Sequence, residues 1–449
     1  MNTKRHREWM KSRAEVRLAA HNREWMSKAG AFWFALLFCS FFFLVPARLP
    51  AQTEAQQKNS CLTCHSQLDA PLHVDTQTFA ESIHAQKGIT CVTCHGGNSS
   101  SDDPTEAMSA AAGFKGAPQR KQVPTFCASC HANAAYMRNF NPSLRTDQYS
   151  QYLTSVHGHL LAKGDTHVAV CVDCHGIHDI LPPDDPRSSV YPTNVAETCG
   201  KCHANAAYMK VYKIPTNQLT LYNTSVHHAE LVGKGDLSAP TCSTCHGSHG
   251  AAPPGVKSVV NVCATCHVFQ AQLFDASPHH DAFSSLGLPG CVTCHSNHGI
   301  QAPSDAFIGV RKGAVCLKCH SAGEPGYDAA AKIHTELTNL DASVTHSRDI
   351  LSRAEQAGVE VGQIQMDLDQ ARDDLTKARV SIHSADLKVV DQNIEAGLKV
   401  TRATYKAGQA ALAQASYRRK GLFISLGITL LVLLSLALLI RKLESGPHF

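Results

Sequence analysis

Nine times in this chain, two cysteines are separated by two residues and the second is followed at once by a histidine. This spacing is that of covalent c-type haem attachment, in which each thiol adds to one vinyl group and the histidine binds the iron. The composition predicts roughly 0.05 such matches by chance, so the repetition predicts nine haem c groups. The nine motifs are Cys61/Cys64/His65, Cys91/Cys94/His95, Cys127/Cys130/His131, Cys171/Cys174/His175, Cys199/Cys202/His203, Cys242/Cys245/His246, Cys263/Cys266/His267, Cys291/Cys294/His295 and Cys316/Cys319/His320.

Two other uses of paired cysteines compete with haem. Zinc ribbons also use Cys-x-x-Cys units, but zinc chemistry does not require a histidine directly after each pair. Structural disulfides would not fix one spacing at every site. The regular histidine therefore favours haem at all nine motifs.

Each iron needs a second axial ligand or leaves one position open for chemistry. Nine histidines outside the motifs match nine irons, which favours bis-histidine ligation throughout. The predicted ligands are His73, His84, His157, His178, His227, His249, His279, His298 and His334. The histidines expected not to be ligands are His159, His167, His228, His280, His346 and His383. Met137 and Met209 are alternative axial ligands, although their spacing after a motif favours packing roles.

An internal repeat orders these histidines. Four of them precede a motif in a Ser-x-His frame, and three others lie three residues after a motif histidine, too close to reach the far face of the same haem. Each unit then ends in a second motif, which predicts four two-haem modules after a lone first haem. Asn98 stands where the other modules have histidine, so one haem there must borrow a ligand, with His73 as the candidate. Residues 97–124, rich in Ser, Gly and Ala, look like a flexible insertion.

The first 51 residues predict a signal peptide or an N-terminal anchor. The apolar run over residues 31–45 is short for a membrane span and typical of a signal-peptide core, and it contains Cys39, the one cysteine outside the motifs. Met26 is a candidate for the true start, because the layout from there is more ordinary. Haem attachment takes place outside the cytoplasmic membrane, so the body of the protein is expected in the periplasm.

The sequence changes character after Pro325, with no cysteine and no further proline before Pro447. Apolar residues from Val361 to Val389 alternate in steps of three and four, which predicts a heptad seam. Glycines at 358 and 397 favour breaks, so a hairpin or short bundle competes with a long coiled coil. Residues 421–440 are uncharged and mostly apolar, the length of a membrane helix.

These features divide the chain into five segments. The predicted segments are 1–51 (signal peptide or anchor), 52–325 (nonahaem domain), 326–420 (helical stalk), 421–440 (transmembrane helix) and 441–449 (cytoplasmic tail). The predicted fold class is mostly α with extensive irregular loop. The formal net charge of +4 gives no argument for nucleic acid, because eighteen propionates would add roughly −18, and no basic run with interleaved aromatics is present.

Residues 60–335 resemble class III multihaem cytochromes c, the tetrahaem-type and doubled-CxxCH proteins. The resemblance implies an electron carrier at the bacterial inner membrane, between a quinol-linked membrane subunit or periplasmic cytochrome and a periplasmic or extracellular acceptor. An alternative is an oxidoreductase similar to multihaem nitrite reductases or hydroxylamine oxidoreductases, which would need one haem with an open distal face. The stalk is a further candidate for oligomerisation.

Overall fold

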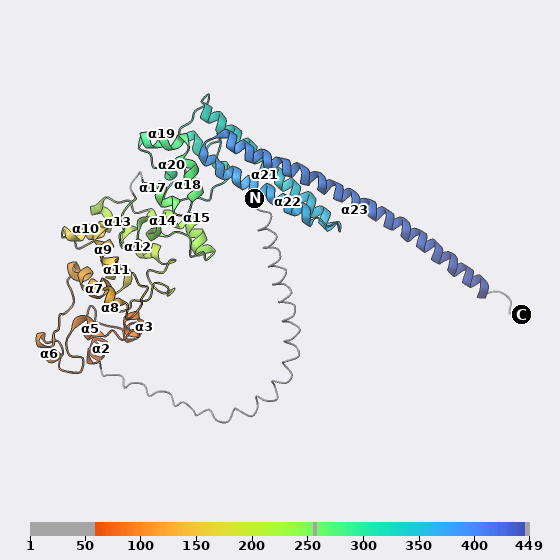
Figure 1. Ribbon diagram of the computed structural model, residues 1–449. Coiled ribbons are helices and arrows are strands. Elements are labelled where there is room, and N and C mark those ends of the chain that lie inside the picture. The colour runs from red at the N-terminus through yellow and green to blue at the C-terminus, as the bar shows by residue number, and fades with distance from the viewer. Residues whose placement is uncertain (1–58, 255–257, 445–449) are drawn as a thin grey trace, which may run out of the picture.

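The computed structural model describes residues 59–254 and 258–444, and it divides into a haem-motif region and a helical bundle (Figure 1). The described part is mostly helical and contains no β-strand, which confirms the predicted fold class. The haem-motif region runs from the red end of the chain in Figure 1 to the bundle, so its first motif lies farthest from the bundle. The predicted leader over residues 1–51 lies outside the described residues.

The haem-motif region consists of short helices joined by loops. Its first half contains α2 (Ser60–His65), α3 (Thr76–Glu81), α4 (Ile83–Gln86), α5 (Cys91–His95), α6 (Pro104–Ala107), η1 (Ala110–Ala112), η2 (Arg120–Gln122), α7 (Val123–His131), α8 (Ala134–Met137), α9 (Gln148–Thr154), α10 (Val156–Ala162) and α11 (Cys171–His175). Its second half contains α12 (Val195–His203), α13 (Ala206–Met209), η3 (Lys210–Tyr212), α14 (Gln218–Asn223), α15 (Val226–His228), η4 (Ala229–Gly233), α16 (Cys242–His246), α17 (Val259–Ala264), α18 (Val268–Asp275), α19 (Pro278–Leu286), α20 (Gly290–His295), η6 (Asp305–Phe307) and η7 (Val315–Lys318).

A large cavity replaces a side-chain core in most of this region. It has a volume of about 2980 Å³ and is lined by all three residues of each of the first six motifs. The largest cluster of buried apolar residues beside it has only four members, Val123, Leu161, Val168 and Val170. These helices are too short to be stable alone in water, so the groups that fill the cavity must supply much of the apolar interior.

Three longer helices form the bundle: α21 (Pro325–Gln356), α22 (Gly362–Ser381) and α23 (Leu387–Glu444). Each contacts the other two. The chain turns at Gly358, whose φ of 81° suits glycine, and again through η8 (Ile382–Ser384) and Ala385. The seam predicted over residues 361–389 is therefore interrupted after Ile382, and within α22 it is buried against the chain's own helices.

The predicted break at Gly397 is wrong, because α23 continues through it. A Cβ at Gly397 would lie 2.9 Å from two methyl carbons of Leu340, and one at Gly408 would lie 2.7 Å from Ile350 Cγ2. These glycines therefore allow close approach of α21 and α23. They belong to a second heptad stripe of mostly small buried residues on α23: Val390, Ile394, Gly397, Thr401, Thr404, Gly408, Ala411 and Ala415.

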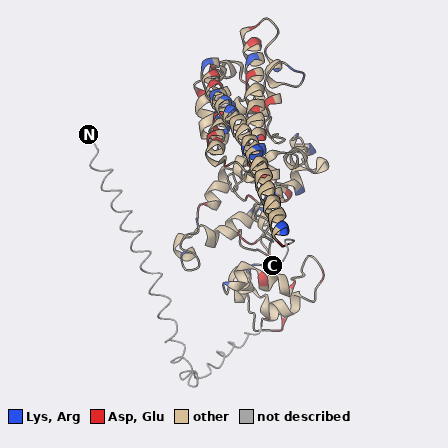
Figure 2. Ribbon diagram, turned by 90° about the vertical axis from the view of Figure 1, so that its right-hand side faces the viewer, with Lys and Arg blue, Asp and Glu red and all other residues tan. Residues whose placement is uncertain are grey.

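Beyond Ala415, α23 leaves the bundle and projects alone (Figure 1). Its most apolar window of 18 residues has a mean hydropathy of 2.8 and buries none of its residues in the protein. This is the one helix among the described residues that is long and apolar enough to cross a membrane. Figure 2 shows Lys and Arg at both ends of that uncharged stretch, which are Arg418, Arg419 and Lys420 on one side and Arg441 and Lys442 on the other.

Candidate haem sites

Eight of the nine motif histidines face a second histidine. The ring centroids of each pair are separated by 5.9 to 6.4 Å, close to two metal–nitrogen bonds of about 2 Å plus about 1 Å from each nitrogen to its ring centre. The pairs are His84–His131, His95–His178, His157–His203, His175–His249, His227–His267, His246–His298, His279–His320 and His295–His383. The structure therefore leaves room for one iron between the rings of each pair.

The pairs follow one rule along the repeat. Each Ser-x-His histidine faces the second motif of its own module, as His157 faces His203. Each histidine that follows a first motif by three residues faces the first motif of the preceding module, as His249 faces His175. Consecutive modules thus exchange ligands, so no module has a complete set of its own.

Buried serines explain the Ser-x-His frame. The side chain of Ser82 accepts a hydrogen bond from Ala85 N, Ser155 from Gly158 N and Ser225 from His228 N. Each serine caps the start of a helix, where such a bond satisfies a free backbone N–H. The next residue, Ile83 in the first module, then donates its backbone N–H to Ile180 O of the following module at 2.8 Å. The frame therefore fixes both the histidine and the contact between modules.

A sharp turn after the first motif of each module sends the following histidine away from its own haem site. Gly176 and Gly247 both have φ of 82°, and Ser296 adopts φ of 67° and ψ of −174° at the equivalent place. Positive φ with extended ψ is a region that only glycine adopts without strain. The turn carries His178, His249 and His298 to the neighbouring module.

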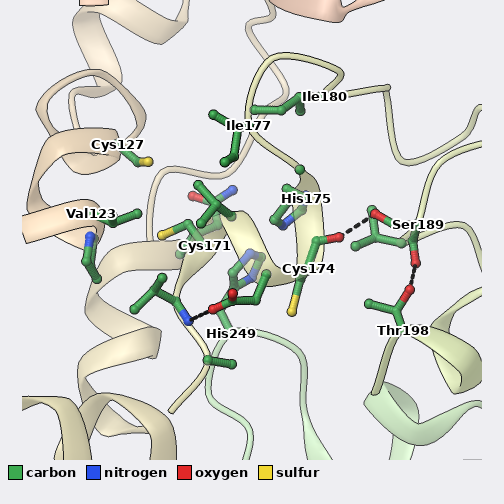
Figure 3. Close-up of a pocket in the computed structure, with 18 of the residues that line it drawn as sticks. Val123, Cys127, Cys171, Cys174, His175, Ile177, Ile180, Ser189, Thr198 and His249 are labelled. Atoms are coloured by element: carbon green, nitrogen blue, oxygen red, sulfur yellow. Dashed lines mark hydrogen bonds between the residues drawn. The ribbon is translucent and has the colours of Figure 1, made fainter. Parts of the chain in front are cut away.

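Figure 3 shows one complete site, formed by Cys171, Cys174 and His175 on α11 with His249 approaching from the next module. Ser189 donates its hydroxyl hydrogen bond to Cys174 O, and Thr198 donates to Ser189 O at 2.7 Å. The Asp173 carboxylate accepts from Val170 N at 2.6 Å and binds Arg120 through both oxygens. These contacts fix the motif helix while its thiols and histidine line the cavity.

Backbone carbonyls orient several rings for metal binding. Nδ1 of His65 lies 2.9 Å from Leu72 O, and Nδ1 of His95 lies 2.9 Å from Gly116 O. His383 makes the same contact with Val380 O at 2.8 Å. A carbonyl only accepts, so Nδ1 carries the proton and Nε2 keeps the lone pair that binds iron. Residues 97–124, predicted as a flexible insertion, fold into α6, η1 and η2 and supply the carbonyl for His95.

The electrostatics of the pairs favour neutral rings. Burial, and then the facing histidine, lower the pKa of His84, His157 and His175. Burial alone lowers the pKa of His131. Iron ligation requires the neutral imidazole, so these surroundings suit a ligand.

The motif cysteines bring consecutive motifs together in chain order. The thiols of Cys127 and Cys171 hydrogen-bond, which raises the pKa of Cys127 and lowers that of Cys171. The first cysteines of the fifth and sixth motifs and of the seventh and eighth make the same contact, Cys199 with Cys242 and Cys263 with Cys291. Burial and then Cys91 raise the pKa of Cys61, which places the first two motifs side by side in the same way.

The second cysteines join the remaining neighbours. Burial, and then the approach of Cys130, raise the pKa of Cys94. The same juxtaposition of second cysteines recurs between later motifs: Cys174 with Cys202, Cys245 with Cys266, and Cys294 with Cys319. All nine motifs therefore form one row in chain order, with alternating edges in contact.

The structure does not bring two of the predicted ligands to a motif histidine. His73 is exposed, and its Nδ1 lies 3.1 Å from Leu68 O. His334 lies on α21, with Nδ1 2.9 Å from Asp305 O and a buried Nε2 that has no partner. Neither ring faces a motif ring, whereas the other seven predicted histidines do.

One facing residue was missed by the sequence argument. His383, on η8 of the bundle, lies with its ring 6.0 Å from that of His295. No module follows the last one, so the bundle supplies the histidine that a fifth module would have supplied. The repeat contained this signal, because it leaves the eighth motif without a donor, but sequence spacing could not identify a donor 88 residues away.

Three family models match parts of the chain. Cytochrome c3 matches residues 83–204, the doubled CXXCH motif matches residues 285–324, and the model for cytochrome c554 and c-prime matches residues 46–96. Comparison with curated proteins and with solved structures gave no match. The three matched segments contain six complete motifs.

Proposed function

Because the chain is a multihaem c-type cytochrome, we propose that it is a membrane-anchored nonahaem relay that moves electrons along its length. The haem irons, when bound, supply one-electron carriers. The row of motifs in chain order is the observation that carries the proposal. It holds the attachment points next to one another from Cys61 to Cys319, with no branch along the contacts described.

The relay has two different ends. The ninth motif lies beside the bundle, since η7 contacts α21, and the first motif lies at the opposite end of the region (Figure 1). We propose that α23 spans the bacterial inner membrane and that the haem-motif region lies in the periplasm. The ninth motif then faces a quinol-linked membrane subunit or a periplasmic cytochrome as donor, and the first faces the acceptor.

The bundle also contributes to the last sites, in addition to acting as a spacer. Arg379 on α22 binds both oxygens of Asp305 at 2.8 and 2.7 Å, and His383 faces His295. Such a bidentate pair is specific in geometry. We propose that this contact fixes the membrane-side end of the row relative to the bilayer. Its role in oligomerisation is a separate proposal, which light scattering with and without residues 330–420 tests.

Injection of electrons at one end tests the relay. Lys312 is exposed and lies four residues before Cys316, so a photosensitiser on a Lys312→Cys variant injects electrons beside the ninth motif. With repeated flashes and a sacrificial donor, all nine haems should become reduced. Adding Cys199→Ala and Cys202→Ala removes the fifth haem, and only the sixth to ninth haems should then be reduced rapidly.

A matched control removes the haem at the far end. With Cys61→Ala and Cys64→Ala, all eight remaining haems should still be reduced as in the parent protein. Rapid reduction of all eight haems in the Cys199/Cys202 variant would show a branched network and overturn the linear relay.

A further inference from the structure

The first motif stands apart from the other eight in the surroundings of its histidine. His65 has its Nδ1 bound to Leu72 O, like other motif histidines. Among residues 59–254 and 258–444, however, no second histidine ring faces it, whereas every other motif histidine has such a partner. The difference is therefore in the distal side and not in the proximal one.

The thiol contacts identify which half of a module the first motif represents. Cys61 lies beside Cys91 as Cys127 lies beside Cys171, so the first motif corresponds to the second motif of a module. The distal histidine of a second motif comes from a Ser-x-His frame upstream of the first motif in the same module. Residues 26–60 contain neither an earlier motif nor any histidine.

Asn98 fits this truncated module. The histidines equivalent to it, His178, His249 and His298, each face the first motif of the preceding module. The module before Asn98 has no first motif, so a histidine there would have no haem to bind. Asn98 instead accepts from Ser100 N at 3.1 Å through its side-chain oxygen. The missing first motif and the missing histidine therefore have one cause, and no haem needs to borrow a ligand on account of Asn98.

His73 is the remaining histidine close in sequence to this motif. It is exposed, its Nδ1 is held at Leu68 O, and it does not line the cavity in which His65 lies. The distal side of His65 thus receives no imidazole from the described chain.

We propose that the haem attached at Cys61 and Cys64 has an open distal iron position that binds small lone-pair donors such as carbon monoxide or cyanide. The proposal rests on the proposed attachment of nine haems. It places an exogenous-ligand site at the end of the row farthest from the bundle, where the relay would deliver electrons. Iron with one histidine and a free position is high-spin, whereas bis-histidine iron is low-spin and does not take up carbon monoxide readily.

The test titrates carbon monoxide into the reduced holoprotein and measures high-spin ferric haem by EPR. We expect one carbon monoxide and one high-spin haem per chain. The Cys61→Ala/Cys64→Ala variant should bind none and should keep the low-spin signals of the other eight haems. The intact mass reports the haem number independently, so a failure of nine-haem attachment is distinguishable from a failure of this proposal.

Two histidine variants serve as matched controls. His227→Ala should open a second site and raise the stoichiometry from one to two, which verifies the assay. His73→Ala should leave it at one. A wild-type protein that binds no carbon monoxide and is wholly low-spin would overturn the proposal, and a His73→Ala variant that gains a first site would assign His73 as the ligand.

Discussion

The haem-motif region and the bundle are both helical, but different interiors stabilise them. The bundle has fourteen buried apolar residues in one cluster, whereas the largest such cluster in the haem-motif region has four. Its helices are long, and the helices of the other region have nine residues at most. The comparison teaches that secondary-structure content does not reveal what holds a region together, because one interior is made of side chains and the other is left for a cofactor.

Loss of the haems should have the largest effect and separate the two regions. A chain produced without haem attachment should be unfolded over residues 59–324, because its short helices have little else to pack against, as in metal-dependent small domains. The bundle should remain folded. Limited proteolysis with mass spectrometry should yield one protected fragment that starts near Pro325. Equal protection of both regions would break the comparison.

A cavity in the bundle should have the converse effect. The Leu368 side chain is fully buried, so Leu368→Ala should lower the free energy of unfolding of the bundle by about 2–5 kcal/mol. Denaturant unfolding followed by helix circular dichroism measures this change. The control is Met366→Ala, two residues away and 67% exposed, which should change stability by less than about 0.5 kcal/mol. An equal loss in both variants would contradict the assigned core.

Substitution of His383 sharpens the boundary between the regions. His383→Ala should convert one low-spin haem to high-spin, because it removes the ring that faces His295. His334→Ala should leave every haem low-spin that was low-spin before, since His334 faces no motif ring. EPR of the ferric holoprotein measures both outcomes. The reverse result would restore His334 as the ligand and show that the bundle is only attached beside the haem sites.

A strained turn should give the smallest effect. Ser296 occupies a backbone region that glycine adopts freely and other residues adopt at a cost of about 1–3 kcal/mol. Ser296→Gly should therefore stabilise the holoprotein by about 1 kcal/mol, after allowance for the greater freedom of glycine in the unfolded chain. Thermal unfolding measures the change. Ser248→Gly, at an exposed position without positive φ, should give no stabilisation.

The sequence predicted the motifs, the helical class and the uncharged apolar span, because each depends on local spacing or composition. It also identified seven of the eight histidines that face a motif, since the repeat places them. It did not identify His383, because that contact depends on how η8 packs against the last module. The pairing between modules was likewise beyond the sequence, since it depends on turns such as the one at Gly176.

Glycine gave the least reliable local signal. Gly358 ends a helix with positive φ, as predicted, but Gly397 lies inside α23 against Leu340. The same residue type serves a turn in one place and close helix packing in the other. Only the neighbouring helix distinguishes these roles, and a single sequence does not contain it.

The intact mass of the mature holoprotein tests the central claim most directly. The account predicts the polypeptide mass plus nine haem groups that stay attached under denaturing conditions, because each is bonded through two thiols of one motif. A mass that corresponds to fewer haems, or to bare polypeptide, would contradict it.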